Sequence, residues 1–294
     1  MLTKMSSSPK FQPTQDSPVL SDRDFRQLQA VIRKLSGIHM SESKFTLVAS
    51  RVIRRLRALN MKGFAEYLEY LSDEPPESEW QDLVNCVTTN KTEFFREPHH
   101  FRILRSRVLI PRKAAHPTSQ SRRLRIWSAA CSGGHEPYTI AMTLSETLGS
   151  LLSWDVRILA SDIDTDVLKI AESGYYPEDQ IADIPKELRL RYCQKVTVSG
   201  QTRYRMSDEV KSLIAFRRIN LNETPWPIRT KFHVIFCRNV MIYFDRPTQQ
   251  QLLRRFYDFL EPGGLLFLGH SENIFGMEAY YSSLGETVYQ RKAH

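Results

Sequence analysis

The stretch Leu124–Thr139, which reads LRIWSAACSGGHEPYT, decides the fold of this chain. Its first residues, Leu124–Trp127, form a short apolar run typical of a buried strand, and a helical pattern covers residues 136–148. Gly133 and Gly134 lie between them and allow the backbone to approach a ligand closely, although two glycines also make an ordinary tight turn. The G-x-G-x-x-G dinucleotide fingerprint is absent. The stretch therefore predicts a strand, a loop able to hold a cofactor, and a helix.

The alternation of strands and helices continues downstream of this stretch. Helical patterns cover residues 165–173 and 247–260, and short apolar runs indicate strands at residues 156–160, 232–237 and 265–268. Strands that alternate with helices are typical of a parallel sheet covered by helices on both faces. We therefore predict a doubly wound α/β domain over residues 124–294.

One insert, at residues 190–216, interrupts the alternation. Val196–Val198 is strand-like, Ser199 and Gly200 are typical of a hairpin turn, and an apolar run follows at residues 213–216. We expect the whole insert to form a small antiparallel β-subdomain at the edge of the main sheet.

The first ninety residues predict an all-helical domain at residues 21–90. Ser21 and Asp24 resemble a capping box, and Gly37 is a plausible stop for the helix that they begin. Further helical patterns cover residues 44–60, 64–71 and about 80–87.

The segments on either side of this domain are polar. Residues 1–20 lack an apolar core and are expected to form a disordered tail. Residues 91–123 are expected to join the two domains, with a connector helix at residues 99–109 and a polar loop at residues 111–123.

The composition of the 294-residue chain narrows the class of protein. The formal net charge of +8 indicates an acidic partner, or simply serves solubility. No apolar run is long enough to span a bilayer, and the N-terminus lacks the apolar segment of a secretory signal. The four cysteines are far apart and form no C-x-x-C pair, so we expect neither a metal site nor disulfides, and a cytoplasmic location.

Asp162 is a candidate cofactor ligand because it ends the second predicted strand, 26 positions after Glu136. A carboxylate at this place accepts hydrogen bonds from ribose hydroxyls in nucleotide-binding folds. The alternative is a helix cap, but Asp164 fits the cap better and leaves Asp162 freer for a ligand. Together with the glycine loop, Asp162 favours an adenosine-bearing cofactor without saying which.

Two further motifs place polar side chains near the expected ligand edge of the sheet. Cys237–Asp245, CRNVMIYFD, follows a buried strand, and it differs from the Asn-Pro-Pro-Tyr motif of enzymes that methylate amide or exocyclic nitrogens. Thr88–Glu97, TTNKTEFFRE, holds Arg96, whose planar guanidinium suits a carboxylate. The alternatives are a structural turn for the first motif and a surface loop for the second.

Taken together and in order, five motifs resemble the CheR family of chemotaxis receptor methyltransferases. They are TTNKTEFFRE, IWSAACSGGHEPYTIA, ILASDIDTDVL, FHVIFCRNVMIYFD and GGLLFLGHSEN. The resemblance implies a class I methyltransferase fold with an N-terminal helical domain and a β-subdomain insert. It also implies S-adenosylmethionine as methyl donor, S-adenosylhomocysteine as product, and glutamate side chains of methyl-accepting chemotaxis receptors as substrate.

The resemblance also assigns residues by motif position. It implies that the donor is contacted by Asn90, Thr92, Arg96, Glu136, Asp162, Asn220, Leu221, Cys237 and Arg238. It places Arg96 and Tyr243 at the methyl-transfer site. His135 stands where the family usually has glutamate, which predicts either a tolerated variation or a pH-sensitive affinity for the donor. Some relatives dock on a receptor's C-terminal pentapeptide through the β-subdomain, and the sequence decides neither this nor which receptor is the substrate.

The implied chemistry agrees with elementary reactivity. A glutamate carboxylate, with a pKa of about 4.3, is already an ionised nucleophile near pH 7, so no general base is needed. Alignment of the reacting atoms can lower the barrier by roughly 7–11 kcal/mol. Two rival functions are an RNA or other S-adenosylmethionine-dependent methyltransferase and a non-catalytic adenosine-nucleotide sensor. We expect a monomer with no nucleic-acid partner and no membrane insertion.

Three arginines of the helical domain predict a docking surface. Arg51, Arg54 and Arg55 occupy positions i, i+3 and i+4 of one helix and so share a face, opposite the apolar side chains. Such a face is often only a solvated surface. The functional interpretation is that it attracts the acidic methylation region of the receptor.

Overall fold

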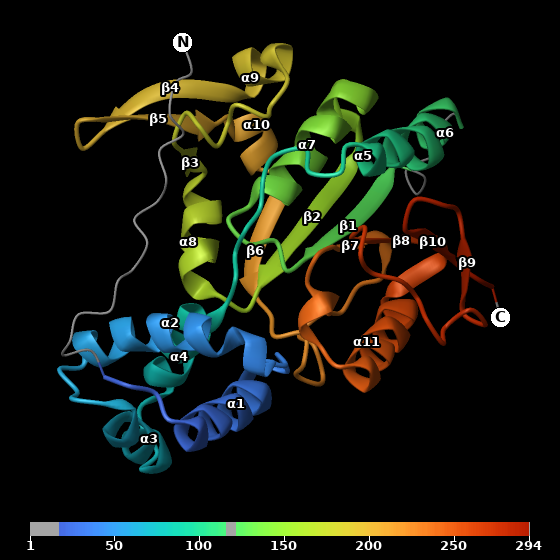
Figure 1. Ribbon diagram of the computed structural model, residues 1–294. Coiled ribbons are helices and arrows are strands. Elements are labelled where there is room, and N and C mark those ends of the chain that lie inside the picture. The colour runs from blue at the N-terminus through green and yellow to red at the C-terminus, as the bar shows by residue number, and fades with distance from the viewer. Residues whose placement is uncertain (1–17, 116–121, 294) are drawn as a thin grey trace, which may run out of the picture. The chain divides into compact units, whose positions relative to one another are not determined.

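The computed structural model describes residues 18–115 and 122–293, and the chain divides into two compact units after Thr88 (Figure 1). Most of the predicted disordered tail, residues 1–20, lies outside the described residues. Leu20, which is described, is buried in the core of the first unit.

The first unit is helical, as predicted. Its elements are α1 (Asp22–Ser36), the 3-10 turn η1 (Glu42–Lys44), α2 (Phe45–Ala58), α3 (Phe64–Ser72) and α4 (Glu77–Val87). The hydroxyl of Ser21 accepts a hydrogen bond from the backbone N–H of Asp24 (3.1 Å), and Gly37 ends α1 at φ 74°. Both predicted ends of this helix are therefore confirmed. Leu28, Val52 and Leu83 are fully buried where α1, α2 and α4 turn their apolar faces to a common core.

A buried carboxylate, that of Glu79 in α4, faces α2 and α3. Only 2% of its side chain is exposed. The Nε of Arg55 donates to Glu79 Oε1 (2.9 Å), and the hydroxyl of Tyr67 donates to the same oxygen (2.6 Å). The hydrogen bond and charge of Glu79 hold the pKa of Arg55 above its usual range. Arg55 therefore compensates a charge that folding removes from water.

The prediction that Arg51, Arg54 and Arg55 form one solvent-facing surface is wrong. Arg51 Nη1 donates to the backbone carbonyls of Val87 (2.5 Å) and Thr88 (2.6 Å), where it anchors the end of α4. Arg51 and Arg55 thus face the neighbouring helix, and Arg54 is the member of the three that is exposed. Helical spacing places residues on one face, but it does not reveal that a second helix packs there.

This arrangement separates the neighbours Arg54 and Arg55 in their effects on stability. Arg55→Ala is expected to lower the free energy of unfolding by about 1–3 kcal/mol, because it leaves Glu79 buried without its guanidinium. Arg54→Ala is expected to change it by at most about 0.5 kcal/mol, as is usual at exposed sites. Urea unfolding of both variants measures the difference, and equal losses would contradict the assigned role of Arg55.

The second unit is built on a seven-stranded sheet. Its order is β6 (Ile214–Arg218), β2 (Asp155–Asp162), β1 (Arg123–Ala129), β7 (Phe232–Cys237), β8 (Leu260–Leu268), β10 (Val288–Arg291) and β9 (Tyr281–Ser283). The first five strands are parallel, and β10 runs antiparallel to both β8 and β9. The chain leaves β1 toward β2 and returns on the other side at β7, so the order reverses at β1. Ligands of such sheets bind at the carboxyl ends of the strands beside this reversal.

The second unit also contains helices and short helical turns. They are α5 (His99–Ile103), the π-helical turn η2 (Leu104–Leu109), α6 (Ile110–Ala114), α7 (His135–Leu148), the 3-10 turn η3 (Leu151–Ser153), α8 (Thr165–Ser173), α9 (Lys186–Tyr192), α10 (Asp208–Lys211), the 3-10 turn η4 (Met241–Tyr243) and α11 (Arg246–Phe259). β1 is buried on both faces, as expected for a central parallel strand. Ile126 belongs to the core that includes Leu144 of α7, and Trp127 packs against Phe256 of α11 (ring centroids 5.4 Å). Figure 1 shows α7 along the strands β1 and β2.

The predicted insert is in part correct. Cys193–Val198 (β4) and Gln201–Met206 (β5) form the expected antiparallel hairpin, with positive φ at both turn residues, Ser199 (49°) and Gly200 (75°). The apolar run predicted to complete the insert instead forms β6, which pairs in parallel with β2 in the main sheet. The third strand of the small sheet is β3 (Tyr175–Tyr176), which pairs with β5. A short apolar run does not reveal its partner strand, which explains this error.

The predicted loop at residues 111–123 is wrong over its first part, because the helix continues to Ala114. The turn before Pro111 is π-helical: the N–H of Ile110 bonds to the carbonyl of Arg105. Pro111 then stands in the first turn of α6, directly after this π-helical turn, and π-helical turns are a usual place for a proline within a continuous helix. Residues 116–121 lie outside the described residues.

The end of the sheet also differs from expectation. The Pro-Gly-Gly sequence after α11 lies within β8, which pairs with β7 through Phe232↔Leu260 and then, after a register shift, through Val234↔Leu265. The short strands β9 and β10 were not predicted. No helix in the described part of the chain is both long and apolar enough to cross a lipid bilayer.

Candidate active site

The carboxyl ends of β1, β2, β6 and β7 bring the predicted site residues of the second unit toward one edge of the sheet. The loop at residues 130–134 leaves β1 and bends back to start α7. It uses three left-handed residues, Ala130 (φ 60°), Ser132 (φ 49°) and Gly134 (φ 87°). A Cβ at Gly134 would lie 2.8 Å from the Cβ of Ala171, so glycine is required both by the backbone and by the packing.

Asp162 holds this loop. Its Oδ2 accepts from the N–H of Ser132 (2.7 Å) and its Oδ1 from the N–H of Asp164 (3.0 Å). The prediction that Asp164 caps α8 is confirmed, because its carboxylate accepts from the first turn of that helix. Asp162 is less free than predicted, but a carboxylate has about four acceptor positions and can still bind a ligand hydroxyl. Burial raises the pKa of Asp162 to about 6.

Asn90 belongs to the same corner of the site. Its side-chain amide donates to Asp164 Oδ2 (2.7 Å), and its carbonyl accepts from the hydroxyl of Ser132 (3.2 Å). The polar segment before α5 is thus tied to the ends of both β1 and β2. Thr92 lies half-buried in this segment.

Glu136 and Arg238 form an ion pair across the edge. Arg238 Nη1 donates to Glu136 Oε2 (3.0 Å), and the hydroxyl of Ser128 donates to Oε1 (2.6 Å). Burial raises the pKa of Glu136, while Arg238 and Ser128 oppose that rise. Only 3% of the Arg238 side chain is exposed, so this pair joins α7 to the end of β7 inside the protein.

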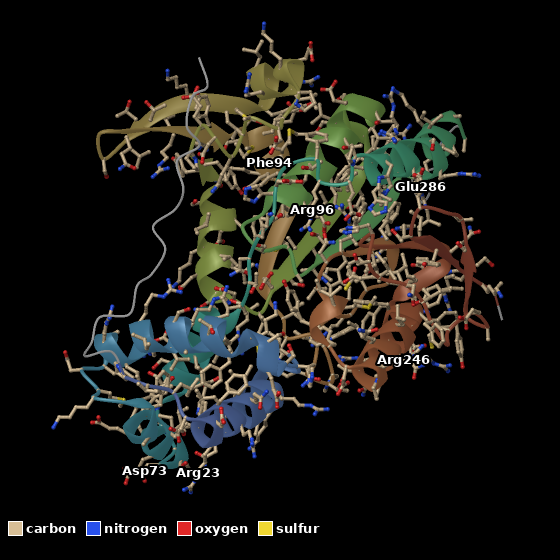
Figure 2. All side chains as sticks on the ribbon, viewed as in Figure 1. Arg23, Asp73, Phe94, Arg96, Arg246 and Glu286 are labelled. Carbon is tan, nitrogen blue, oxygen red and sulfur yellow. The ribbon has the colours of Figure 1, made fainter. Side chains whose placement is uncertain are left out.

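The other guanidinium nitrogen of Arg238 fastens the segment that carries Arg96. Arg238 Nη2 donates to the backbone carbonyl of Arg96 (2.5 Å) and lies 3.2 Å from Glu97 Oε2. The half-buried side chain of Arg96 donates to the carbonyl of Lys91 (3.2 Å). Figure 2 shows Arg96 on the coil before α5, near the labelled Phe94. The structure therefore links the backbone of Arg96, through Arg238, to Glu136.

The predicted residues after β6 lie at the same edge, because the N–H of Ile219 bonds to the carbonyl of Asp162 (3.0 Å). Asn220 is buried, and its side-chain oxygen accepts from the N–H of Asn222 (3.0 Å). The carbonyl of Leu221 accepts from Arg255 Nη1 (2.8 Å). These contacts fix the turn after β6.

Cys237 and Tyr243 are the predicted residues that follow the buried strand β7. Cys237 is fully buried at the end of β7, and burial raises the pKa of its thiol well above the usual range. Tyr243 is half-buried at the end of η4. The side-chain amide of Gln249 donates to the carbonyl of Met241 (2.9 Å) and so fixes the backbone of η4.

Glu272, which the sequence analysis did not single out, holds the turn that carries Tyr243. Its carboxylate accepts from four backbone N–H groups, those of Gly269 (2.6 Å), Asn239 (2.9 Å), Val240 (2.9 Å) and Met241 (2.7 Å). A Cβ at Gly269 would lie 2.8 Å from the nitrogen of Asn239. The GHSEN motif therefore clamps the turn after β7. The sequence showed this motif, but the motif alone did not assign a role to Glu272.

Glu97 is a second residue that was missed. Besides Arg238 it binds His270, whose Nδ1 lies 3.0 Å from Glu97 Oε1, and the side-chain amide of Asn239 (3.3 Å). The hydrogen bonds from His270 and Asn239 and the charge of Arg238 outweigh burial and lower the pKa of Glu97 to about 2. Glu97 also lies near His99 and His100, a grouping that could hold a cation. Because Arg238 already neutralises this carboxylate, we assign no metal here.

His135, which follows the glycine loop directly, lies in a cluster of aromatic rings with Phe94 and Tyr176. Its ring packs against Phe94 (centroids 4.6 Å) and Tyr176 (5.0 Å), and its Nε2 lies 3.3 Å from Gln180 Oε1. Burial lowers the pKa of His135 to about 4, so the ring is neutral near pH 7. Where the family usually has glutamate, this chain thus has an uncharged ring.

A concave surface at the opposite end of the sheet is distinct from this site. It is lined by residues that include Arg107, Arg112, His233 and Glu261. None of the residues predicted to bind the donor or the substrate lines it. The motifs meet instead at the carboxyl ends of the strands.

Similarity to known proteins agrees with this arrangement. A family model described as CheR methyltransferase, SAM binding domain, matches residues 90–290, and one described as CheR methyltransferase, all-alpha domain, matches residues 23–88. The chain is 47% identical over 266 residues to chemotaxis protein methyltransferase 2 of Pseudomonas aeruginosa, covering 90% of this chain and 92% of the relative. It is 42% identical over 271 residues to the chemotaxis protein methyltransferase of Escherichia coli, covering 92% and 91%. S-adenosylmethionine is therefore the cofactor, and the chain belongs to the CheR methyltransferase family.

Proposed function

We propose that this enzyme transfers the methyl group of S-adenosylmethionine to glutamate side-chain carboxylates of chemoreceptors and so forms glutamate methyl esters. The observation that carries the proposal is the connection of Arg96, through Arg238, to Glu136 at the edge where the cofactor loop begins. Relatives named chemotaxis protein methyltransferase support a protein substrate in chemotaxis and do not favour RNA or a non-catalytic sensor.

The residues at the edge fit the chemistry of the donor. S-adenosylmethionine carries ribose hydroxyls, an ammonium and a sulfonium, all of which are donors or cations. The edge offers two buried or half-buried carboxylates, Asp162 and Glu136, and the carbonyls of a tightly bent loop. We propose that Asp162 binds the ribose and that Asn90, Thr92, Asn220, Leu221, Cys237 and Arg238 complete the donor site. When bound, the donor supplies an activated methyl group.

The protein's own part in the reaction is to orient the substrate. A glutamate carboxylate is ionised near pH 7, so the site has to position it rather than deprotonate it. We propose that the guanidinium of Arg96 and the phenol of Tyr243 align the carboxylate. Arg96 is half-buried and also bonds to the carbonyl of Lys91. Such a partly engaged arginine orients the carboxylate without stabilising its ground state strongly, which would oppose attack.

The experiment that tests this function is methylation of purified receptor cytoplasmic domains with labelled donor. A methyl ester releases labelled methanol in mild alkali, whereas methylated amines and amides keep the label. We expect all incorporated label to be released. Label that survives alkali would show that the acceptor is not a carboxylate, and labelling of RNA instead of receptor would support the rival enzyme.

Protonation of Asp162 provides a separate prediction. If its ionised form accepts from the donor's ribose, affinity for S-adenosylmethionine should fall as the pH falls below about 6, the raised pKa of Asp162. The loss approaches about tenfold per pH unit, because one proton must be released for binding. Calorimetry from pH 5 to pH 8 measures it. In Asp162→Asn the affinity for S-adenosylmethionine should be lower and should not depend on pH in this way. If the affinity of the parent enzyme does not change between pH 5 and pH 8, Asp162 does not bind the ribose in its ionised form.

Arg54 is the part of the predicted docking surface that the structure leaves exposed. We propose that the helical domain predicted at residues 21–90 attracts an acidic receptor region through this residue. Arg54→Glu is expected to raise the KM for receptor several-fold and to weaken its salt dependence, because exposed charge pairs are worth about 0–1 kcal/mol each. The matched control is Arg23→Glu, an exposed arginine of α1 that Figure 2 labels. If both variants have the same KM, the position of Arg54 has no special role.

A further inference from the structure

The carbonyl of Gly133 is held by a tyrosine from a distant part of the chain. The hydroxyl of Tyr176 donates to this carbonyl at 2.6 Å. The side chain of Tyr176 is fully buried, so water does not compete for the bond. A Cβ at Gly134 would lie 2.9 Å from the same hydroxyl, which shows how closely the tyrosine supports the loop. Asp162 thus holds the loop at Ser132, and the phenolic hydroxyl of Tyr176 holds it at Gly133.

The ring of Tyr176 also fixes the segment that carries Arg96. Its edge packs against Phe94 (centroids 5.1 Å) and His135 (5.0 Å), and the rings of Phe94 and His135 contact each other (4.6 Å). Three aromatic rings therefore hold the glycine loop, the start of α7 and the TTNKTEFFRE segment together. Edge-to-face contacts of this kind add about 0.5–1.5 kcal/mol each beyond their buried area.

The backbone of Tyr176 belongs to the small sheet. Tyr176 is the second residue of β3 and pairs with Tyr204 of β5. The same residue is thus a strand residue of the β-subdomain and the support of the cofactor loop. A two-residue strand does not explain why this position is a buried tyrosine, whereas the bond to Gly133 does.

We infer that Tyr176 is a positioning residue for the methyl donor: its hydroxyl sets the Gly133 carbonyl, and with it the loop that receives the donor, from the small sheet. The inference rests on the proposed placement of the donor at this loop. Loss of the hydroxyl leaves the buried Gly133 carbonyl without this partner and loosens the loop at Gly133, while Asp162 still holds Ser132. Donor binding should therefore weaken while the chemistry of bound donor is kept.

The chain offers a matched control in Tyr138. Its side chain is also fully buried, lies in contact with Tyr176 (centroids 6.1 Å), and donates one hydrogen bond to a backbone carbonyl, that of Ala171 (2.9 Å). Ala171 belongs to α8 and not to the glycine loop. Tyr138→Phe therefore removes the same chemical group from the same cluster without touching the proposed donor contact.

The experiment compares Tyr176→Phe and Tyr138→Phe by calorimetry with S-adenosylmethionine, by thermal unfolding and by steady-state kinetics. Both variants should lose a similar amount of Tm, since each loses one buried hydrogen bond. Tyr176→Phe should raise the Kd and the KM for the donor about tenfold, because the donor must then order a part of the loop that the hydroxyl no longer holds, with kcat kept at saturating donor. Tyr138→Phe should change the Kd for the donor by no more than about twofold from the parent value. This is well below a tenfold change, which corresponds to about 1.4 kcal/mol.

Two results would overturn the inference. An unchanged donor Kd in Tyr176→Phe, or equal increases in both variants, would show that the tyrosine is only part of the core. The variant Asp162→Asn, measured in parallel, shows whether the donor binds at this loop at all. If Asp162→Asn and Tyr176→Phe both leave the Kd for S-adenosylmethionine unchanged, the donor binds elsewhere, and both the proposed donor site and the role of Tyr176 are wrong. Because binding of the donor is measured without receptor, none of these results depends on glutamate being the acceptor.

Discussion

Replacing Arg238 with alanine is expected to lower the free energy of unfolding by about 3–5 kcal/mol, the cost of breaking a buried ion pair from one side. The guanidinium is the shared partner of Glu136, Glu97 and the carbonyl of Arg96, and only 3% of its side chain is exposed. Its loss leaves two largely buried carboxylates, those of Glu97 and Glu136, without their shared cation. For a unit of this size each kcal/mol lowers the Tm by about 2–4 °C, so thermal unfolding measures the effect readily.

The pH dependence of this variant gives an independent check. Burial already raises the pKa of Glu136, and Arg238 is one of the groups that oppose the rise. Without Arg238 the folded-state pKa lies further above the unfolded value, so the native state binds a proton that the unfolded state does not. The stability deficit of Arg238→Ala should therefore shrink as the pH falls. A deficit that is constant or grows on acidification, or one below about 0.5 kcal/mol, would contradict the bridging role.

Arg96→Ala is expected to lower kcat/KM for receptor methylation about a hundredfold, the scale of a misplaced reactive group, while the fold is kept. The side chain is half-buried, and the single bond that the structure gives it goes to the carbonyl of Lys91. Its removal should therefore cost little stability. Tyr243→Phe should have a smaller effect in the same direction.

The controls for Arg96 separate charge from geometry. Arg96→Lys keeps the charge but loses the planar fork, so it should recover only part of the rate. Arg246→Ala, at an exposed arginine that stacks on Phe275 in the same unit and is labelled in Figure 2, should leave the rate unchanged. A parent-like rate in Arg96→Ala would remove this residue from the site.

The sequence predicted those parts of the fold that local chemistry determines. The helix that begins after Ser21 and ends at Gly37 and the cap at Asp164 were predicted because each depends on residues a few positions apart. The strands of the parallel sheet were predicted because burial on both faces gives continuous apolar runs. The sheet topology also predicted that the motifs would meet at the carboxyl ends of the strands.

Other features depend on partners that are remote in the sequence. Arg51 and Arg55 look like a free basic face by their spacing, but α4 packs beside them and supplies the carbonyls and Glu79. The strand β3 has two residues and no periodicity, so its pairing with β5 was invisible. Pro111 suggested a loop, yet the π-helical turn before it lets the helix continue. For the arginines and for β3 a tertiary contact decided what the local pattern left open, and for Pro111 a local change of helical hydrogen bonding did.

Glu272 has a consequence for the time at which a newly made chain becomes active. A nascent chain that has been synthesised only as far as Tyr243, the end of η4, already contains Asp162, Glu136 and Arg238, but it lacks the Glu272 carboxylate that gathers the N–H groups of residues 239–241. Ribosomes add residues from the N-terminus at about 5–20 per second, so this clamp arrives seconds after the rest of the edge. The turn bearing Tyr243 is therefore set only after residue 272 has been made, and shorter chains hold the other residues of the candidate site without this clamp.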